Sequence, residues 1–138
     1  MKPALKATGR YLRLVSNWPP RPIRDRKAHQ AALKVLEQLA SSDMSAEELD
    51  YFEVVSLLVE SYERKILEPD TQAEPHEILE FLMEENGLRQ ADLVSMVGSR
   101  SHLSEFFGGK RNLSKSAAAK LAERFKVRPE IFLPRIGG

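Results

Sequence analysis

The chain has 138 residues, no cysteine and a formal net charge of +1, with 42% hydrophobic and 30% charged residues. This composition is that of a globular protein with one or two modest cores, and it argues against a disordered or fibrous chain. The missing cysteines exclude disulfides, thiolate zinc sites and cysteine nucleophiles. Because the sequence lacks a membrane-spanning apolar run and a secretory signal, we expect a cytoplasmic protein.

The small net charge hides a strong segregation along the chain. Residues 1–30 carry eight Lys or Arg against one Asp, residues 31–86 carry three against fifteen Asp or Glu, and residues 87–138 carry ten against four. The net charges of the three segments are therefore +7, −12 and +6. A basic C-terminal segment suits a polyanion such as DNA, whereas the acidic centre suits a basic protein partner.

Residues 1–24 form a basic, partly apolar segment. It ends in Trp18–Pro22, where three prolines prevent a helix from continuing. The pattern predicts an arm with a short element and a hinge.

Two amphipathic helices are predicted next. Asp25 is a suitable N-cap for a helix whose apolar residues recur at helical spacing as far as Leu39. Ser45 and Glu48 then match a capping box, which predicts a long helix from Ala46 to about Leu67, ending before Pro69.

The long helix carries two apolar stripes, so it needs cover on two sides. One stripe is Leu49, Phe52, Val59 and Ile66, and the other is Tyr51, Val54, Val55, Leu58 and Tyr62. The cover is either a small bundle formed by this chain or a partner protein that also meets an acidic rim of Glu53, Glu60 and Glu63. Residues 25–70 are accordingly expected to be a helical region for partner binding or dimerisation.

A polar linker, residues 68–74, separates this region from a second domain at residues 75–138. Pro75 suits the first turn of a helix that ends at Asn86-Gly87, and a helix of about two turns closes at Gly98. Ser99 is a suitable cap for a helix that buries Leu103 and Phe106 and stops at Gly108-Gly109. Ser114 caps a fourth helix, and residues 127–132 add a short fifth. Two short helices joined at a glycine turn predict a helix-turn-helix within residues 75–133 of an all-α protein.

Four sequence blocks resemble the phage-repressor (Xre/Cro) type of helix-turn-helix: Gly87–Leu93, Gly98–Ser104, Gly109–Ser114 and Leu121–Phe125. The turn at Gly98-Ser99 is one residue shorter than in most of that family. Together with the Gly-Lys-Arg-x-Leu-Ser block and the upstream helix, this feature resembles the HigA-type antitoxins of bacterial toxin–antitoxin pairs.

The resemblance implies that the second helix of the motif lies in the major groove of DNA and presents Arg100, Ser101, His102 and Glu105 to base edges. Arg100 is the best candidate for guanine, with a phosphate contact as the alternative. Glu105 either accepts from cytosine or orients Arg100 or Arg111, and His102 meets a base or a phosphate. Phosphate contacts are expected from the residues flanking the groove helix, namely Gln90, Ser99, Ser104, Lys110, Arg111 and Asn112.

Proteins of this type bind palindromic operators as homodimers. The C-terminal residues Val127, Ile131, Phe132 and Ile136 form either a dimer interface or part of the domain core. The HigA resemblance further implies a small basic RNA-cleaving toxin, for which we expect contacts at Glu53, Leu58, Glu60, Tyr62 and Glu63. The alternative is a repressor without a toxin. No catalytic motif, metal site or cofactor site is indicated, so we expect no enzymatic activity.

Overall fold

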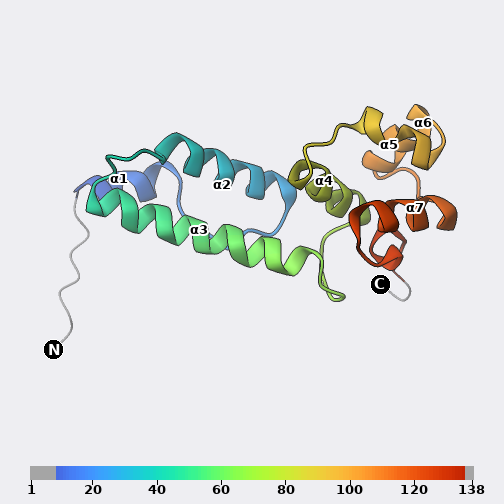
Figure 1. The fold of residues 1–138 in the computed structure, drawn as a ribbon. Helices are drawn as coiled ribbons and strands as arrows, with labels where there is room; N and C mark the ends of the chain where they lie inside the picture. Colours follow the sequence, from blue (N-terminus) through green and yellow to red (C-terminus); the bar gives the residue numbers. More distant parts are fainter. Residues whose placement is uncertain (1–8, 136–138) are drawn as a thin grey trace. The chain divides into compact units, whose positions relative to one another are not determined.

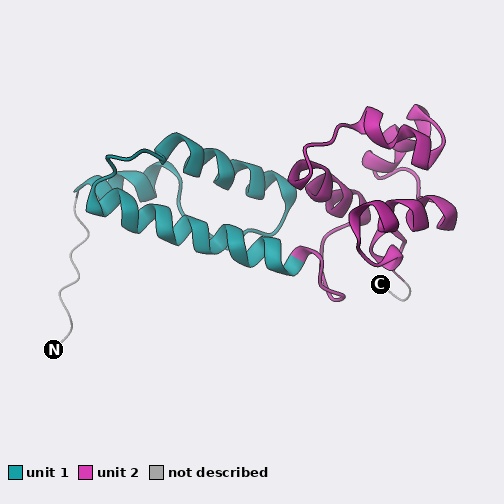
Figure 2. Ribbon diagram, in the orientation of Figure 1, with its two compact units in different colours: residues 1–65 teal, residues 66–138 magenta. Residues whose placement is uncertain are grey.

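The computed structural model describes residues 9–135, and within these the chain is entirely helical, as the sequence predicted. It divides into two compact units, residues 1–65 and residues 66–138 (Figure 2). No helix in the described part is both long and apolar enough to cross a membrane.

Unit 1 contains α1 (Gly9–Asn17), α2 (Arg26–Leu39) and α3 (Ala46–Ile66), the last ending one residue beyond the unit (Figure 1). Helices α2 and α3 begin where the sequence predicted. Asp25 Oδ1 accepts from the Ala28 amide at 2.8 Å, and the Ser45–Glu48 capping box forms, with bonds of 2.8 and 3.2 Å. These bonds satisfy amides that lack a partner within the helix, so local chemistry alone sets the starting points of α2 and α3.

The core of unit 1 lies where the three helices meet, and its buried members are Leu14, Ala32, Tyr51, Val55 and Val59. The described part of residues 1–24 differs from the expected arm because α1 is packed into this core. The Tyr11 amide donates to Glu47 Oε1 at 2.8 Å, and Arg10 Nη2 donates to Glu48 Oε2 at 2.7 Å. The acidic start of α3 therefore holds the first turn of α1. Residues 1–8 lie outside the described part.

A polar group is also built into the interior of unit 1. His29 is 1% exposed and lies between Arg26 Nη1, 2.7 Å from Nδ1, and Glu63 Oε2, 2.8 Å from Nε2. Because a guanidinium can only donate, Nδ1 must accept and the proton of a neutral ring belongs on Nε2, which donates to Glu63. This bond joins one side of α2 to one side of α3.

Unit 2 contains α4 (Pro75–Glu85), α5 (Gln90–Val97), α6 (Arg100–Phe107), α7 (Lys115–Phe125) and the 3₁₀ helix η1 (Pro129–Phe132). Four α-helices and a short final helix match the five helices predicted for this domain. Helix α5 contacts α6 and α7, and η1 contacts α4 and α7. The core gathers apolar side chains from every helix: Ile78, Leu79, Leu82, Leu93, Leu103, Phe106, Ala118, Leu121 and Phe132.

Candidate nucleic-acid interface

The two helices of the predicted motif are joined by two residues, Gly98 and Ser99. Gly98 has φ +114°, a conformation that side-chain-bearing residues rarely adopt, so glycine permits the abrupt end of α5. Ser99 then caps α6, its Oγ accepting from the His102 amide at 3.1 Å. Both features follow from residue type and agree with the prediction.

The inner side of α6 fixes the helix in unit 2. Leu103 is 1% exposed and Phe106 4% exposed, and both meet the region around Leu93, which is fully buried. The prediction that Leu103 and Phe106 belong to the core is confirmed. With these residues turned inward, the other side of α6 faces solvent.

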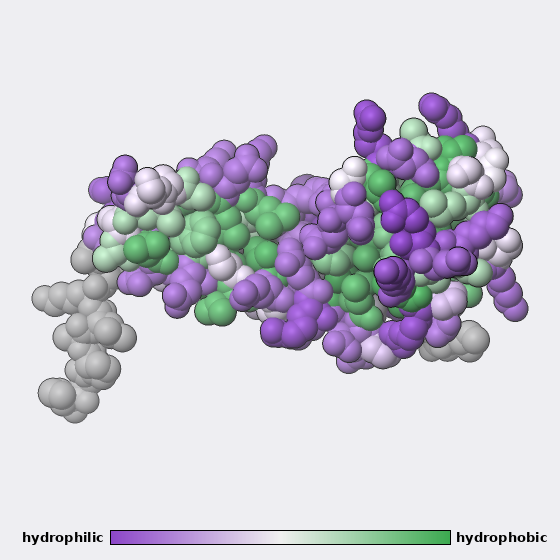
Figure 3. Space-filling view, viewed as in Figure 1, coloured by the Kyte–Doolittle hydropathy of each residue, from purple (hydrophilic) through white to green (hydrophobic). Residues whose placement is uncertain are grey.

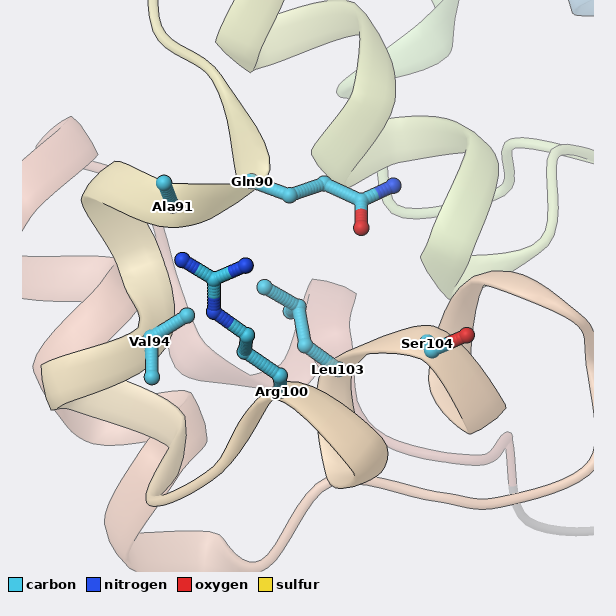
Figure 4. Close-up of a pocket in the computed structure, with 6 residues that line it drawn as sticks. All are labelled: Gln90, Ala91, Val94, Arg100, Leu103 and Ser104. Atoms are coloured by element: carbon cyan, nitrogen blue, oxygen red, sulfur yellow. The ribbon is translucent and has the colours of Figure 1, made fainter.

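The four residues predicted to read bases are all exposed on α6: Arg100, Ser101, His102 and Glu105. Three of them occupy its first turn. Figure 4 shows the Arg100 side chain extending from α6 toward the beginning of α5, where Gln90 and Ala91 lie. A shallow cavity of about 170 Å³ opens here, lined by Gln90, Ala91, Val94, Arg100, Leu103 and Ser104.

Ala91 and Val94 are the cavity residues that the sequence reasoning did not name. The sequence could have indicated them, because they lie one and four positions after Gln90 in α5, the short helix that precedes α6. Both line the cavity beside the Arg100 side chain (Figure 4).

The structure places the predicted phosphate-binding residues in two groups. Gln90, Ser99 and Ser104 belong to α5, α6 or the turn between them, and Ser99 is half-buried because it serves as the cap. Lys110, Arg111 and Asn112 are exposed in the segment between α6 and α7.

One ion pair links α6 to this second group. Arg111 Nη1 donates to Glu105 Oε1 at 2.9 Å, and each side chain is 48% exposed. Glu105 is thus paired with Arg111, the arginine that one of its predicted roles involves, and its role toward DNA stays a prediction. An exposed pair of this kind contributes about 0–1 kcal/mol to stability, so its main effect is on the position of Arg111.

The residues predicted for dimerisation and toxin binding do not all reach a surface. Val127 and Ile131 are half-buried, Phe132 is fully buried in unit 2, and Ile136 lies outside the described residues. In unit 1, Glu53 and Glu60 are exposed and Leu58 is half-buried. Glu63 is held by His29, and Tyr62 is buried with its ring 4.8 Å from that of His29.

Comparison with known proteins agrees with this geometry. Residues 79–132 match the family described as Helix-turn-helix. Unit 2 carries a helix-turn-helix domain. Over 56 residues, the chain is 39% identical to the antitoxin HigA of Escherichia coli K12, of Escherichia coli O6:H1 and of Shigella flexneri.

The alignment covers 41% of this chain and 40% of each of these relatives, so the chain matches less than half of their length. The resemblance to the Xre/Cro helix-turn-helix and to HigA that the sequence indicated is confirmed over this segment.

Proposed function

We propose that the protein is the antitoxin of a type II toxin–antitoxin pair and represses its own promoter by sequence-specific binding to DNA. The observation that carries the DNA-binding part is the exposed first turn of α6, where Arg100, Ser101 and His102 face solvent above a fixed apolar side. In this role the protein acts in the bacterial cytoplasm, bound to the nucleoid, and by binding rather than by catalysis.

The groove helix lies in the major groove with its first turn toward the bases. Arg100 donates two hydrogen bonds to O6 and N7 of a guanine, which discriminates against other bases by about 1–3 kcal/mol. Ser101 and His102 read the neighbouring positions. Glu105 holds Arg111 in place for a phosphate, so that a carboxylate near the DNA serves binding instead of opposing it.

Two groups of residues, one on each side of the helix in the groove, bind the DNA phosphates. Gln90 and the amides at the start of α5 meet one strand, where the partial positive charge of a helix N-terminus favours an anion. The second group consists of Lys110, Arg111 and Asn112. Two serines also flank the helix in the groove, Ser99 and Ser104. These contacts position the domain without reading sequence.

One such domain covers a single half-site, so we propose a homodimer on a palindromic operator. Val127 and Ile131 are the members of the predicted interface that retain exposed surface. Phe132 supports them from within the core.

The antitoxin part of the proposal is supported by the name of the matched relatives and by the acidic segment at residues 31–86. A small basic RNA-cleaving toxin has the charge that this segment attracts, and opposite fields accelerate association. Glu53 and Glu60 on α3 are the exposed acids among the predicted toxin contacts.

The DNA-binding part is tested by a gel-shift titration on the chain's own promoter fragment and on an unrelated fragment, across a range of salt concentrations. The wild type should prefer its promoter. Arg100→Ala should lose about 1–3 kcal/mol of that preference and keep weak, salt-sensitive binding. Arg13→Ala is the matched control, because it removes an exposed arginine from unit 1. A wild type without preference at low salt would contradict the proposal.

Co-expression with the product of the neighbouring reading frame separates an antitoxin from a repressor without a toxin. The antitoxin proposal predicts a small basic protein that arrests growth when expressed alone, forms a complex with this chain and is neutralised by it. If no product of a neighbouring frame is toxic or forms a complex, the toxin part is wrong and the repressor remains.

A further inference from the structure

All large hydrophobic side chains that are exposed in the described residues lie in unit 1, namely Leu12, Leu33, Leu49, Val54 and Leu57. Unit 2 contributes none of them. Figure 3 shows hydrophobic side chains open along the face of unit 1 that runs between α2 and α3. A contiguous apolar face of this kind is typical of a surface that another protein covers.

The hydrogen bond between His29 and Glu63 identifies the residues of this face. It requires that the side of α2 bearing His29 adjoins the side of α3 bearing Glu63. Residues three or four apart share one side of a helix. On α2, Leu33 and Leu36 follow His29 at i+4 and i+7. On α3, Ser56, Phe52 and Leu49 precede Glu63 at seven, eleven and fourteen residues.

These five residues line what we call the α2–α3 seam: Leu33, Leu36, Leu49, Phe52 and Ser56. Leu33 is 37% exposed and Leu49 50% exposed, whereas Leu36, Phe52 and Ser56 are half-buried. The seam thus has a half-buried floor and exposed leucines at its edges. Two adjacent antiparallel helices that leave apolar side chains open between them present a surface on which a third helix packs.

Acidic side chains border the seam on both helices. Glu37 follows Leu33 at i+4 on α2, and Glu53 and Glu60 follow Leu49 and Ser56 at i+4 on α3, all three being exposed. The nearby cations are placed differently. Lys34 points about 100° away from Leu33 around α2, and Arg64 lies beyond Glu60 near the end of α3.

This charge pattern indicates which kind of protein surface can bind the seam. If two copies of the seam faced each other, the acidic borders would be brought together, which is unfavourable. A helix with an apolar stripe flanked by Lys or Arg would bury the leucines and place its cations beside Glu37, Glu53 and Glu60.

We infer that the α2–α3 seam is the docking surface for an amphipathic, basic helix of the partner protein. The inference rests on the proposed function, since it names the surface with which the antitoxin holds its toxin. Tyr62 and Glu63 were expected to contact the toxin, but both are engaged within unit 1. In their place, Leu33 and Leu49 become the main partner contacts.

The test measures the affinity of the full chain for the product of the adjacent toxin reading frame. Leu33→Arg and Leu49→Arg introduce positive charge into the seam and should weaken binding by about tenfold or more. Val54→Arg makes the same change at a residue of α3 that is 37% exposed and lies two residues from Phe52 and Ser56, on the opposite side of the helix, and should change the affinity by less than about twofold. Unchanged circular dichroism and DNA binding establish that each variant is folded.

If both seam variants bind the partner as tightly as the wild type does, the seam is not the docking surface, although the antitoxin function stands. If Val54→Arg weakens binding and the seam variants do not, the docking surface is the opposite side of α3 instead. If the wild type itself binds no product of the adjacent frame, the proposed function fails and the seam inference fails with it.

The acidic borders are tested separately by association kinetics. Combining Glu37→Gln, Glu53→Gln and Glu60→Gln should slow association by about tenfold at low salt, and the difference should disappear at high salt because the charges are screened. Equal association rates at low salt would overturn the assignment of a basic partner.

Discussion

The two units distribute polar and apolar side chains in opposite ways. In the described part of unit 2 every large apolar residue is buried or half-buried, and Arg100, Ser101 and His102 are exposed on a fixed helix. Unit 1 buries Arg26 and His29 and leaves leucines of all three of its helices exposed. A complete core with a polar surface suits a polar ligand such as DNA, whereas an incomplete core suits a protein that supplies the missing apolar cover. The two binding functions proposed for this chain therefore use two different kinds of surface.

The largest expected effect tests whether the units are independent. Leu121 is fully buried in α7, so Leu121→Ala should destabilise unit 2 by about 2–5 kcal/mol and impair DNA binding. The single tryptophan, Trp18, and all three tyrosines belong to unit 1. The urea midpoint measured by Trp18 fluorescence should therefore stay unchanged. The unfolding of unit 2, measured by far-ultraviolet circular dichroism, should move to a lower urea concentration.

Lys120→Ala, at the exposed neighbouring position, is the control and should change the stability of unit 2 by less than about 0.5 kcal/mol. If the urea midpoint measured by Trp18 fluorescence also falls in Leu121→Ala, the two units unfold together and are not independent.

A smaller effect is expected from the polar interior of unit 1. The Tyr51 hydroxyl donates to the Trp18 carbonyl oxygen at 2.6 Å, so Tyr51→Phe should lower the free energy of unfolding by about 1 kcal/mol. Burial, followed by the neighbouring Tyr11, raises the pKa of Tyr51 above its ordinary value of 10.0. Its protonated form therefore stabilises the folded state fully below pH 10.0, and this stabilisation is lost as the pH rises through the folded value.

Unfolding followed by Trp18 fluorescence at neutral and alkaline pH measures both effects. Tyr51→Phe should lose stability less steeply above pH 10.0 than the wild type does. Tyr11→Phe keeps the hydrogen bond to Trp18 and is the control. An unchanged stability in Tyr51→Phe would show that this bond does not hold the proline segment to α3.

The smallest effect concerns the contact between α1 and the start of α3. The pKa of Glu48 is lowered mainly by the hydrogen bond from the Ser45 amide and then by that from Arg10. The carboxylate therefore stabilises the folded state above the ordinary value of 4.5, and this stabilisation is lost as the pH falls through the lower folded value.

The thermal midpoint of unit 1 in Glu48→Gln should accordingly be slightly lower than in the wild type at neutral pH and depend less on pH in acid. Asp50→Asn, an exposed acid in the same part of α3, is the control. A wild-type midpoint with the same acid dependence as that of Glu48→Gln would argue against the contact.

The helix starts of both units were predictable because each depends on residues within one turn. Asp25, Ser45, Ser99 and Ser114 all cap the helices expected of them, with bonds to amides three residues later. The exposed residues of α6 were predictable for a related reason. Leu103 and Phe106 are the buried residues of an eight-residue helix, so the side opposite them had to face solvent.

Long-range packing decided what the sequence left open. The two apolar stripes of α3 were equivalent until α1 and α2 were placed, and only the structure shows that Tyr51 and Tyr62 are buried while Leu49 is exposed. The bond between His29 and Glu63 joins residues 34 positions apart, and no local pattern marks it. Local hydrogen-bonding chemistry therefore determined where the helices of this protein begin, whereas tertiary packing determined which of their sides remain open to a partner.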